Sequence, residues 1–136
     1  MNSNQAVFLS KKIYGVAGAS VDKSKFGNTV LVWYKQHNKT VVPINPKEQI
    51  IEGLPVVRDV NDLVKVATTQ FNLLPQDIGL SIVTPPKVSE HILRQAAEVG
   101  IKNVWMQPGS EPANWQNLSS ELGLLAVGGG PCILKS

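Results

Sequence analysis

Apolar positions along the chain fall into short blocks of two kinds, which alternate from one end to the other. Five blocks of four to five mostly apolar residues have the length and flanking turn residues of strands, and they span Lys12–Val16, Thr40–Ile44, Leu80–Val83, Asn103–Met106 and Leu124–Val127. Apolar residues at helical spacing predict helices in the intervening segments, over Gly27–Asn38, after an N-cap at Asn61, over Pro86–Gly100, and from Pro112 to the residue before Gly123. This alternation predicts an α/β fold, a three-layer domain with a parallel five-stranded sheet.

Within these blocks, particular side chains are expected to face the core. The inward residues of the first helix are predicted to be Val30, Leu31, Trp33 and Tyr34, and those after Asn61 to be Leu63, Val64 and Ala67. The helix that begins at Pro86 has one apolar stripe, made of Val88, Ile92, Leu93, Ala96 and Ala97. Pro43 has no N–H to donate and is expected near the end of its strand, and Gly53–Val56 is expected to be a loop or a short extended piece.

Length and composition favour a single compact domain over residues 1–136, with 43% hydrophobic residues available for one core. No apolar run approaches the ~20 residues that cross a bilayer, and the first ten residues do not resemble a leader, so we expect a soluble cytoplasmic protein without membrane contact. The lone Cys132 excludes an internal disulfide and a multi-cysteine metal site.

Charge is distributed unevenly along the chain. Residues 1–50 carry seven lysines against Asp22 and Glu48, whereas residues 51–136 carry six basic and eight acidic residues. The N-terminal part is therefore the one expected to face an anion. Nucleic-acid binding is disfavoured, because no Arg-rich or aromatic-interleaved basic stretch occurs.

A glycine turn follows the first predicted strand and precedes the first predicted helix. It reads Gly15-Val16-Ala17-Gly18-Ala19-Ser20. Backbone N–H groups in such a turn can approach an anion closely, and the dipole of the following helix favours negative charge. The turn therefore predicts a phosphate site, which the loop lysines Lys23, Lys25 and Lys47 could supplement.

The end of the second strand bears on which nucleotide is bound. Dinucleotide sites usually place an acidic residue there to bind the ribose hydroxyls. Here the sequence is Pro43-Ile44-Asn45-Pro46-Lys47, which lacks a carboxylate and offers a lysine. This disfavours NAD and favours a ligand with an extra ribose phosphate, a condition that both coenzyme A and NADP meet.

Several segments, in consistent order, resemble the CoA-binding domain family. They are the glycine turn, Val42–Pro46, Gly53–Val56, Val83–Pro86, Ala97–Lys102 and Gly130–Cys132, so the resemblance runs from about Lys12 to Cys132. The family includes small stand-alone proteins and the N-terminal domain of the succinyl-CoA synthetase α subunit. The resemblance implies a Rossmann-like fold that binds CoA, acyl-CoA or a related nucleotide across the strand ends. The implied ligand-binding residues are Gly15, Gly18, Ala19, Ser20, Lys25, Asn45, Pro46, Lys47, Val83, Thr84, Pro85, Pro86, Gln107 and Gly109.

Catalytic residues are not indicated. The chain stops at Ser136, without the synthetase's phosphohistidine and grasp domains, so ligase activity is not expected. His37 and His91 are expected to face solvent, and no metal site is indicated. Cys132 is expected to pack at the sheet edge, with a mixed disulfide to CoA as the alternative. Three hypotheses remain open: a non-catalytic CoA-binding module, an NAD(P)-binding small oxidoreductase or redox sensor, and a scaffold without ligand. A homodimer or another protein partner also remains open.

Overall fold

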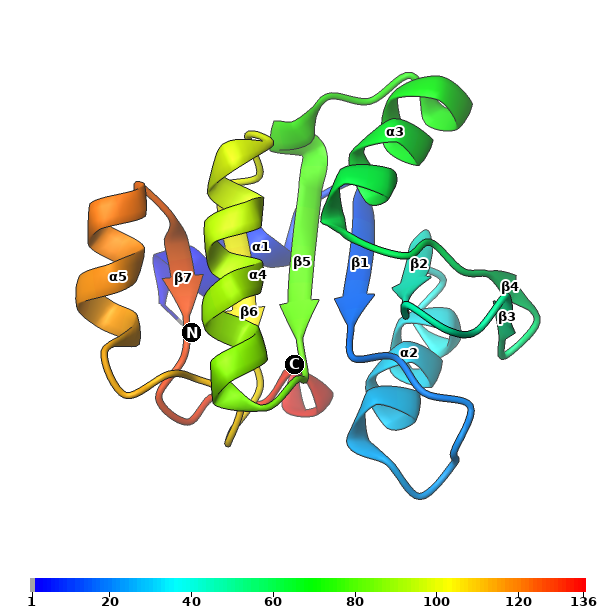
Figure 1. Cartoon of the computed structure of the whole chain (residues 1–136), viewed down its shortest axis with the longest axis horizontal. Helices are drawn as coiled ribbons and strands as arrows, with labels where there is room; N and C mark the ends of the chain where they lie inside the picture. Colours follow the sequence, from blue (N-terminus) through cyan, green and yellow to red (C-terminus); the bar gives the residue numbers. More distant parts are fainter. Residues whose placement is uncertain (1) are drawn as a thin grey trace.

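A parallel five-stranded sheet forms the middle of the molecule (Figure 1). The computed structural model describes residues 2–136. The strand order is β2-β1-β5-β6-β7, with all neighbours parallel. The strands are β1 (Ile13–Ala17), β2 (Val41–Ile44), β5 (Ile78–Ile82), β6 (Asn103–Met106) and β7 (Leu125–Val127). The predicted parallel five-stranded sheet is confirmed.

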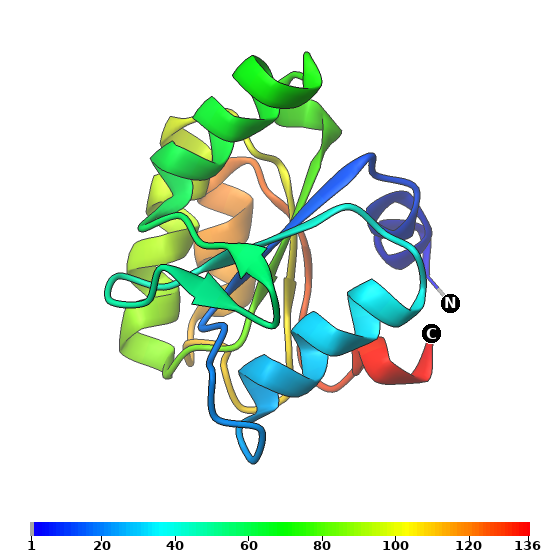
Figure 2. The same ribbon diagram turned by 90° about the vertical axis from the view of Figure 1, so that its right-hand side faces the viewer.

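Helices cover both faces of this sheet, as the edge-on view in Figure 2 shows. One face carries α1 (Ser3–Leu9), α2 (Phe26–Gln36) and the short 3₁₀ helix η2 (Ile133–Lys135). The other carries α3 (Val60–Phe71), α4 (Pro86–Glu98) and α5 (Trp115–Leu122). A small antiparallel hairpin of β3 (Ile50–Ile51) and β4 (Leu54–Pro55) follows β2, and a 3₁₀ turn, η1 (Pro75–Asp77), precedes β5. The three-layer α/β fold is therefore confirmed.

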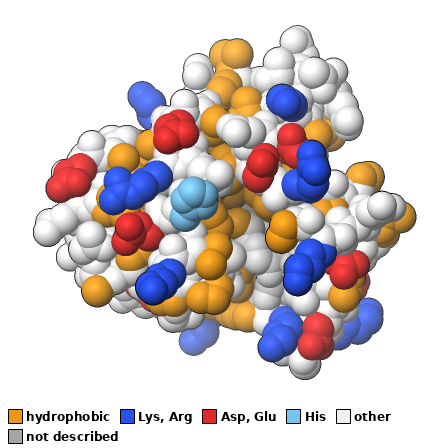
Figure 3. All heavy atoms as spheres, viewed as in Figure 1, with side chains coloured by type: hydrophobic (Ala, Val, Ile, Leu, Met, Phe, Trp, Pro, Cys, Tyr) orange, Lys and Arg blue, Asp and Glu red, His pale blue; other side chains and the backbone are white. Residues whose placement is uncertain are grey.

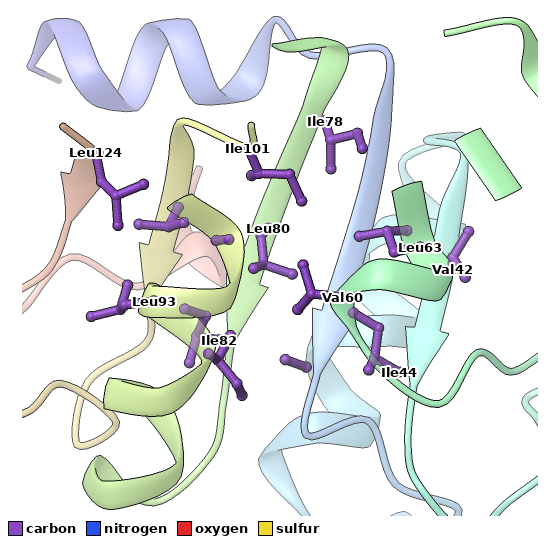
Figure 4. Packing of buried hydrophobic residues seen from close by; sticks show 14 of the residues in the cluster. Val42, Ile44, Val60, Leu63, Ile78, Leu80, Ile82, Leu93, Ile101 and Leu124 are labelled. Carbon is purple, nitrogen blue, oxygen red and sulfur yellow. The ribbon is translucent and has the colours of Figure 1, made fainter. Parts of the chain in front are cut away.

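Two apolar clusters fill the spaces between the layers. Successive strand residues point to opposite faces, so Ile13 and Leu80 pack under α3 and α4, whereas Tyr14 and Trp105 belong to the cluster on the opposite face. Figure 4 shows the first cluster, in which Leu80 and Ile82 of β5 lie between Leu93 and Val60. Both faces of the central strands are buried, which explains why their sequences are continuously apolar.

The predicted bounds of β6 are confirmed, whereas the other four strands differ from the predicted boundaries by one or two residues. At β5 the reason is steric. This strand begins at Ile78 rather than Leu80, so Gly79 lies inside it. A Cβ at Gly79 would lie only 2.8 Å from two ring carbons of Tyr14. The glycine that resembles a boundary in the sequence is therefore a packing position that makes room for the Tyr14 ring.

Three details of the predicted helices are wrong. The N-cap of α3 is Asp59 rather than Asn61, because the Asp59 carboxylate accepts a hydrogen bond from the Asp62 N–H at 2.9 Å. Val88 of α4 does not belong to the buried stripe and is 46% exposed. Pro112 precedes α5 by three residues, since the helix itself begins at Trp115.

The predicted helix over Gly27–Asn38 is largely confirmed. Helix α2 begins at Phe26 and buries Val30, Leu31, Trp33 and Tyr34. It ends before Asn38, whose left-handed φ of 56° terminates the helix. Among residues 2–136, none of the helices combines the length and apolar composition that a membrane crossing requires.

Candidate ligand-binding site

The candidate site lies where the order of the strands reverses. From β1 the chain passes to β2 at the edge of the sheet and then returns to β5 on the other side of β1. In open parallel sheets, ligands bind at this switch point, beyond the carboxyl ends of the strands. Here the loops after β1 and β5 remain joined, since the Val83 N–H donates to the Ala17 carbonyl at 2.9 Å.

Two glycines allow the loop after β1 to pass very close to its neighbours. Gly18 has a φ of +94°, and a Cβ there would lie 3.1 Å from both the Val83 carbonyl and the Thr84 methyl group. A Cβ at Gly27, in the first turn of α2, would overlap the Gly18 carbonyl oxygen. The turn therefore contacts the start of the helix directly. Only glycine, which has no Cβ, fits at both positions.

The N-terminus of α2 opens toward this turn without a side-chain cap. Lys25 is the N-cap residue, and its side chain makes no capping hydrogen bond. The N–H groups of Phe26 and Gly27 have no hydrogen-bond partner among residues 2–136. Free N–H groups at the positive end of the helix dipole, next to a lysine, form an electropositive environment.

Two asparagines hold the loops around the turn in place. The Asn45 side-chain amide donates to the Ala19 carbonyl at 3.0 Å, and its oxygen accepts from the N–H groups of Lys47 and Glu48. The amide of Asn28 donates to the Ser20 carbonyl at 2.9 Å. Asn45 therefore links the loop after β2 to the loop after β1.

Two cavities adjoin the Gly18 turn and share Thr84 as a wall. The first has a volume of about 310 Å³ and is lined by Gly18, Asn45, Pro46 and the α4 face that carries His91 and Ile92, together with Arg58, Asp59 and Val60. The second has a volume of about 420 Å³, and its walls include Lys25, Phe26, Val83, Pro85, Gln107 and Gly109. Figure 3 shows the surface hollowed over the carboxyl-terminal halves of β1 and β5, with basic side chains on both sides of the hollow.

The structure brings most of the sequence-predicted site residues to these cavities. The residues that line one or both are Gly18, Lys25, Asn45, Pro46, Val83, Thr84, Pro85, Gln107 and Gly109. Ala19 is buried in the turn, the Ser20 hydroxyl accepts from the Asp22 N–H at 3.1 Å, and Pro86 is the first residue of α4. Lys47 is exposed on the loop after β2.

Gly15 lies apart from the cavities, in the middle of β1. A Cβ there would come within 2.6 Å of a Leu63 methyl carbon, so the geometry assigns Gly15 to the close packing of α3 on the sheet. Cys132, which is partly exposed beside η2, also lines neither of the two cavities. Neither Gly15 nor Cys132 therefore contributes to the walls of these two cavities.

Four residues that the sequence pattern did not indicate as ligand contacts contribute to the site. Arg58 and Asp59 reach the first cavity because Val57 pairs with Ile44 in an isolated bridge, which returns the chain to the strand ends. His91 is exposed, as expected, but faces that cavity from α4. Of these four residues, only Gly27 could have been identified from the sequence. A glycine in the first turn of a helix that follows a glycine turn indicates that the helix packs closely against the turn.

An acidic side chain also lies near the start of α2. The Glu52 carboxylate accepts a hydrogen bond from Asn28 at 3.1 Å and lies 3.6 Å from the Lys23 ammonium. The hydrogen bond from Asn28 is the main reason that the pKa of Glu52 falls below its usual value of 4.5, and the Lys23 charge adds to the effect. Lys23 is therefore already paired, whereas Lys25 has no carboxylate within 4.0 Å among the residues described.

Comparison with known proteins defines the class to which this fold and site belong. Residues 12–136 match the family described as CoA binding domain, so the chain is a member of the CoA-binding domain family. No curated protein matches significantly.

Among solved structures, a conserved hypothetical protein from Pyrococcus furiosus is similar, with 32% identity, a TM-score of 0.76, and coverage of 92% of this chain and 97% of that one. A hypothetical protein from Pyrococcus horikoshii OT3 has 23% identity and a TM-score of 0.78, covering 97% and 85% of the two chains. A Thermus thermophilus protein has 24% identity and a TM-score of 0.77, covering 99% and 96%. At these lower identities the likeness concerns the fold.

Proposed function

We propose that this domain binds coenzyme A, free or acylated, across the carboxyl-terminal edge of its sheet and has no catalytic activity of its own. The observation that carries the proposal is the pair of cavities that meet at Thr84, next to the Gly18 turn and the uncapped start of α2. A ligand with two bulky ends joined by a diphosphate matches this arrangement. Membership of the CoA-binding domain family supports the same ligand.

In this proposal the diphosphate lies at the turn from Gly18 to Ser20. The free N–H groups at the start of α2 and the ammonium of Lys25 supply the positive charge there. Charge-assisted hydrogen bonds from such groups to phosphate oxygens are among the strongest in proteins. Because the asparagines hold the loops in place, little ordering entropy is lost when the ligand binds.

The two ends of the ligand then occupy different cavities. The adenosine lies in the first cavity, between Pro46 and the α4 face, with its ribose phosphate toward Arg58 and Lys47. The pantetheine follows Val83 and Pro85 toward Gln107. Gln107 suits an amide-containing chain, because its side-chain nitrogen is buried without a partner while its oxygen accepts from the Ile133 N–H at 3.1 Å.

A thermal-shift panel tests this proposal against the nicotinamide and scaffold alternatives. A ligand that binds only the folded protein stabilises it by mass action, by about 2.7 kcal/mol at 100 times its Kd. We expect CoA and acetyl-CoA to raise the Tm by several degrees, dephospho-CoA to raise it less, and NAD and ATP to raise it least. A larger effect of NADP would favour the nicotinamide alternative, and no response to any nucleotide would favour the scaffold.

Replacement of Lys47 tests the proposed contact with the ribose phosphate. Lys47→Ala is expected to reduce the affinity for CoA about threefold to tenfold, as the loss of one exposed charge contact suggests, and to leave dephospho-CoA binding unchanged. Lys65→Ala, on the exposed face of α3, is the matched control and should bind both compounds as the unaltered protein does. Equal losses for CoA and dephospho-CoA would place the phosphate elsewhere.

A further inference from the structure

A separate apolar groove lies along the outer edge of the sheet. Strand β2 is the last strand on this side, and Figure 2 shows it between α2 and α3 with the β3–β4 hairpin beside it. The groove has a volume of about 320 Å³, and its walls are mainly aliphatic and aromatic, with Val41, Leu54, Val57, Val66 and Phe71 among them. Phe71 is 44% exposed, although it is one of the largest apolar side chains of the protein.

Two lysines stand at this groove, and neither forms a close ion pair within residues 2–136. Lys35 and Lys39 are both part of its wall, which contains no acidic residue. Within residues 2–136, neither ammonium has a carboxylate oxygen within 4.0 Å. Lys35 donates instead to the Glu52 main-chain carbonyl at 2.6 Å, and Lys39 approaches the Leu9 carbonyl at 3.5 Å. The Lys35 charge also interacts with the Glu52 carboxylate beyond 4.0 Å. The groove therefore combines an apolar interior with positive charge at Lys39.

The edge of β2 is poorly suited to pairing with another strand. Pro43 has no N–H, and its carbonyl already accepts from the Val57 N–H at 3.0 Å. Only Val41 has backbone groups that point away from β1 and lack a partner within the described chain. A second copy docked here would also bring two more lysines into an apolar interface, which like-charge repulsion disfavours.

We propose that this groove binds a small alkyl carboxylate of medium chain length. The carboxylate pairs with the ammonium group of Lys39, and the alkyl chain lies along Val57, Val66 and Phe71. A volume of about 320 Å³ is at the lower end of the roughly 300–1,000 Å³ typical of small-molecule sites, which suits a chain of about six to ten carbons. The groove shares no lining residue with the two cavities of the CoA site, so this proposal is independent of the proposed function.

Octanoate is the probe for an NMR titration of the ¹⁵N-labelled protein, below its critical micelle concentration. We expect saturable shifts of the Val41 and Phe71 amide signals, while the Gly18 and Thr84 signals stay in place. Octanoate should bind at least about ten times more tightly than butanoate, because four more methylene groups leave water. Octylammonium, which has the same chain and the opposite charge, should bind at least about tenfold more weakly than octanoate.

Two variants separate the charge from the apolar surface. Lys39→Gln should weaken octanoate binding at least about threefold, whereas Lys65→Gln, on the exposed face of α3, should not change it. Val66→Phe should fill part of the groove and weaken octanoate more than butanoate. CoA-induced stabilisation, where present, should be the same in all three variants.

Three outcomes would overturn the proposal. Equal binding of octanoate and octylammonium would remove the role of the lysines. Octanoate shifts confined to Gly18 and Thr84 would place the probe in the CoA site instead. A concentration-dependent dimer in sedimentation that Val66→Phe abolishes would make a second copy the occupant.

Discussion

Gly18 and Gly27 determine the shape of the turn between β1 and α2. Each lies where a Cβ would press against backbone atoms, and backbone cannot move aside as the end of a flexible side chain can. The turn, the start of α2 and the start of the loop after β5 are therefore held in fixed contact. A site formed in this way exists before the ligand arrives, which lowers the cost of binding.

Replacing Gly27 with alanine tests this contact. In an ordinary helix the substitution would stabilise the protein by about 1 kcal/mol, because alanine has the higher helix propensity. Here the overlap with the Gly18 carbonyl should dominate, so we expect Gly27→Ala to lower the free energy of unfolding by about 1–3 kcal/mol in urea denaturation. Thr29→Ala, at an exposed position of the same helix, is the control and should leave the free energy of unfolding unchanged or slightly higher. Unchanged or increased stability of Gly27→Ala would contradict the role given to this contact.

The lowered pKa of Glu52 predicts a specific dependence on pH. A carboxyl group whose pKa is lower in the folded protein stabilises it above the unfolded-state pKa, near 4.5, and this stabilisation is lost as the pH falls through the lower folded value. Glu52→Gln should therefore have a lower Tm than the unaltered protein near pH 7, and the two should converge once the pH falls below the lowered folded-state pKa of Glu52. Glu121→Gln, on an exposed position of α5, should follow the unaltered protein. A constant difference across this range would assign the effect to something other than the carboxylate charge.

At the scale of elements, periodicity predicted the strands and the longer helices, whereas contacts decided where they end. The five apolar blocks identify the strands because β1, β2, β5 and β6 are buried along their whole length, whereas in β7 Leu125 is exposed. The start of β5 was displaced because Gly79 serves the packing of Tyr14, which no local pattern shows. Similarly, Asp and Asn are both residue types that cap helices, and the hydrogen bond that the Asp59 carboxylate accepts from the Asp62 N–H shows that Asp59, not Asn61, caps α3.

Helix α1 could not be predicted for a different reason. It has seven residues and only one buried side chain, Phe8, so it has no periodic pattern to recognise. Its position depends on tertiary contacts: the Phe8 ring lies 5.4 Å from each of the Tyr14 and Trp105 rings, measured between centroids. The Tyr14 hydroxyl also donates to the Phe8 carbonyl at 2.9 Å. The aromatic contacts, rather than helix propensity, hold α1 on the sheet.

Removal of the Phe8 ring should therefore destabilise the protein. Phe8→Ala is expected to lower the free energy of unfolding by about 3–5 kcal/mol, because a fully buried ring leaves a cavity between two others. Urea denaturation followed by tryptophan fluorescence measures both the stability and the changed environment of Trp105. Val7→Ala, at a position that is 40% exposed in the same helix, should change stability by less than about 1 kcal/mol. Similar effects of the two substitutions would show that α1 adds little to the core.

At the scale of the whole molecule, the parallel sheet collects the functional loops on one edge. That much followed from the sequence, because parallel strands separated by helices bring their carboxyl ends together. The division of the edge into two cavities did not follow, since it depends on Thr84 between them and on the return of Arg58 to the strand ends. Gly15 illustrates the same limit of sequence-based prediction. A glycine in a motif can make room either for a ligand or for a packed helix, and at Gly15 the side chain that occupies the space is Leu63 of α3.

The most direct test of CoA binding at this edge is a titration of the ¹⁵N-labelled protein with CoA, followed by NMR. CoA that spans both cavities should shift the amide signals of Gly18 and Ala19 at the turn, and those of Thr84 and Gly109 along the second cavity, with one common Kd. The Val41 signal, in the groove beside β2, should stay in place. Unchanged turn signals at millimolar CoA, or shifts confined to surfaces away from Gly18 and Thr84, would contradict the proposed site.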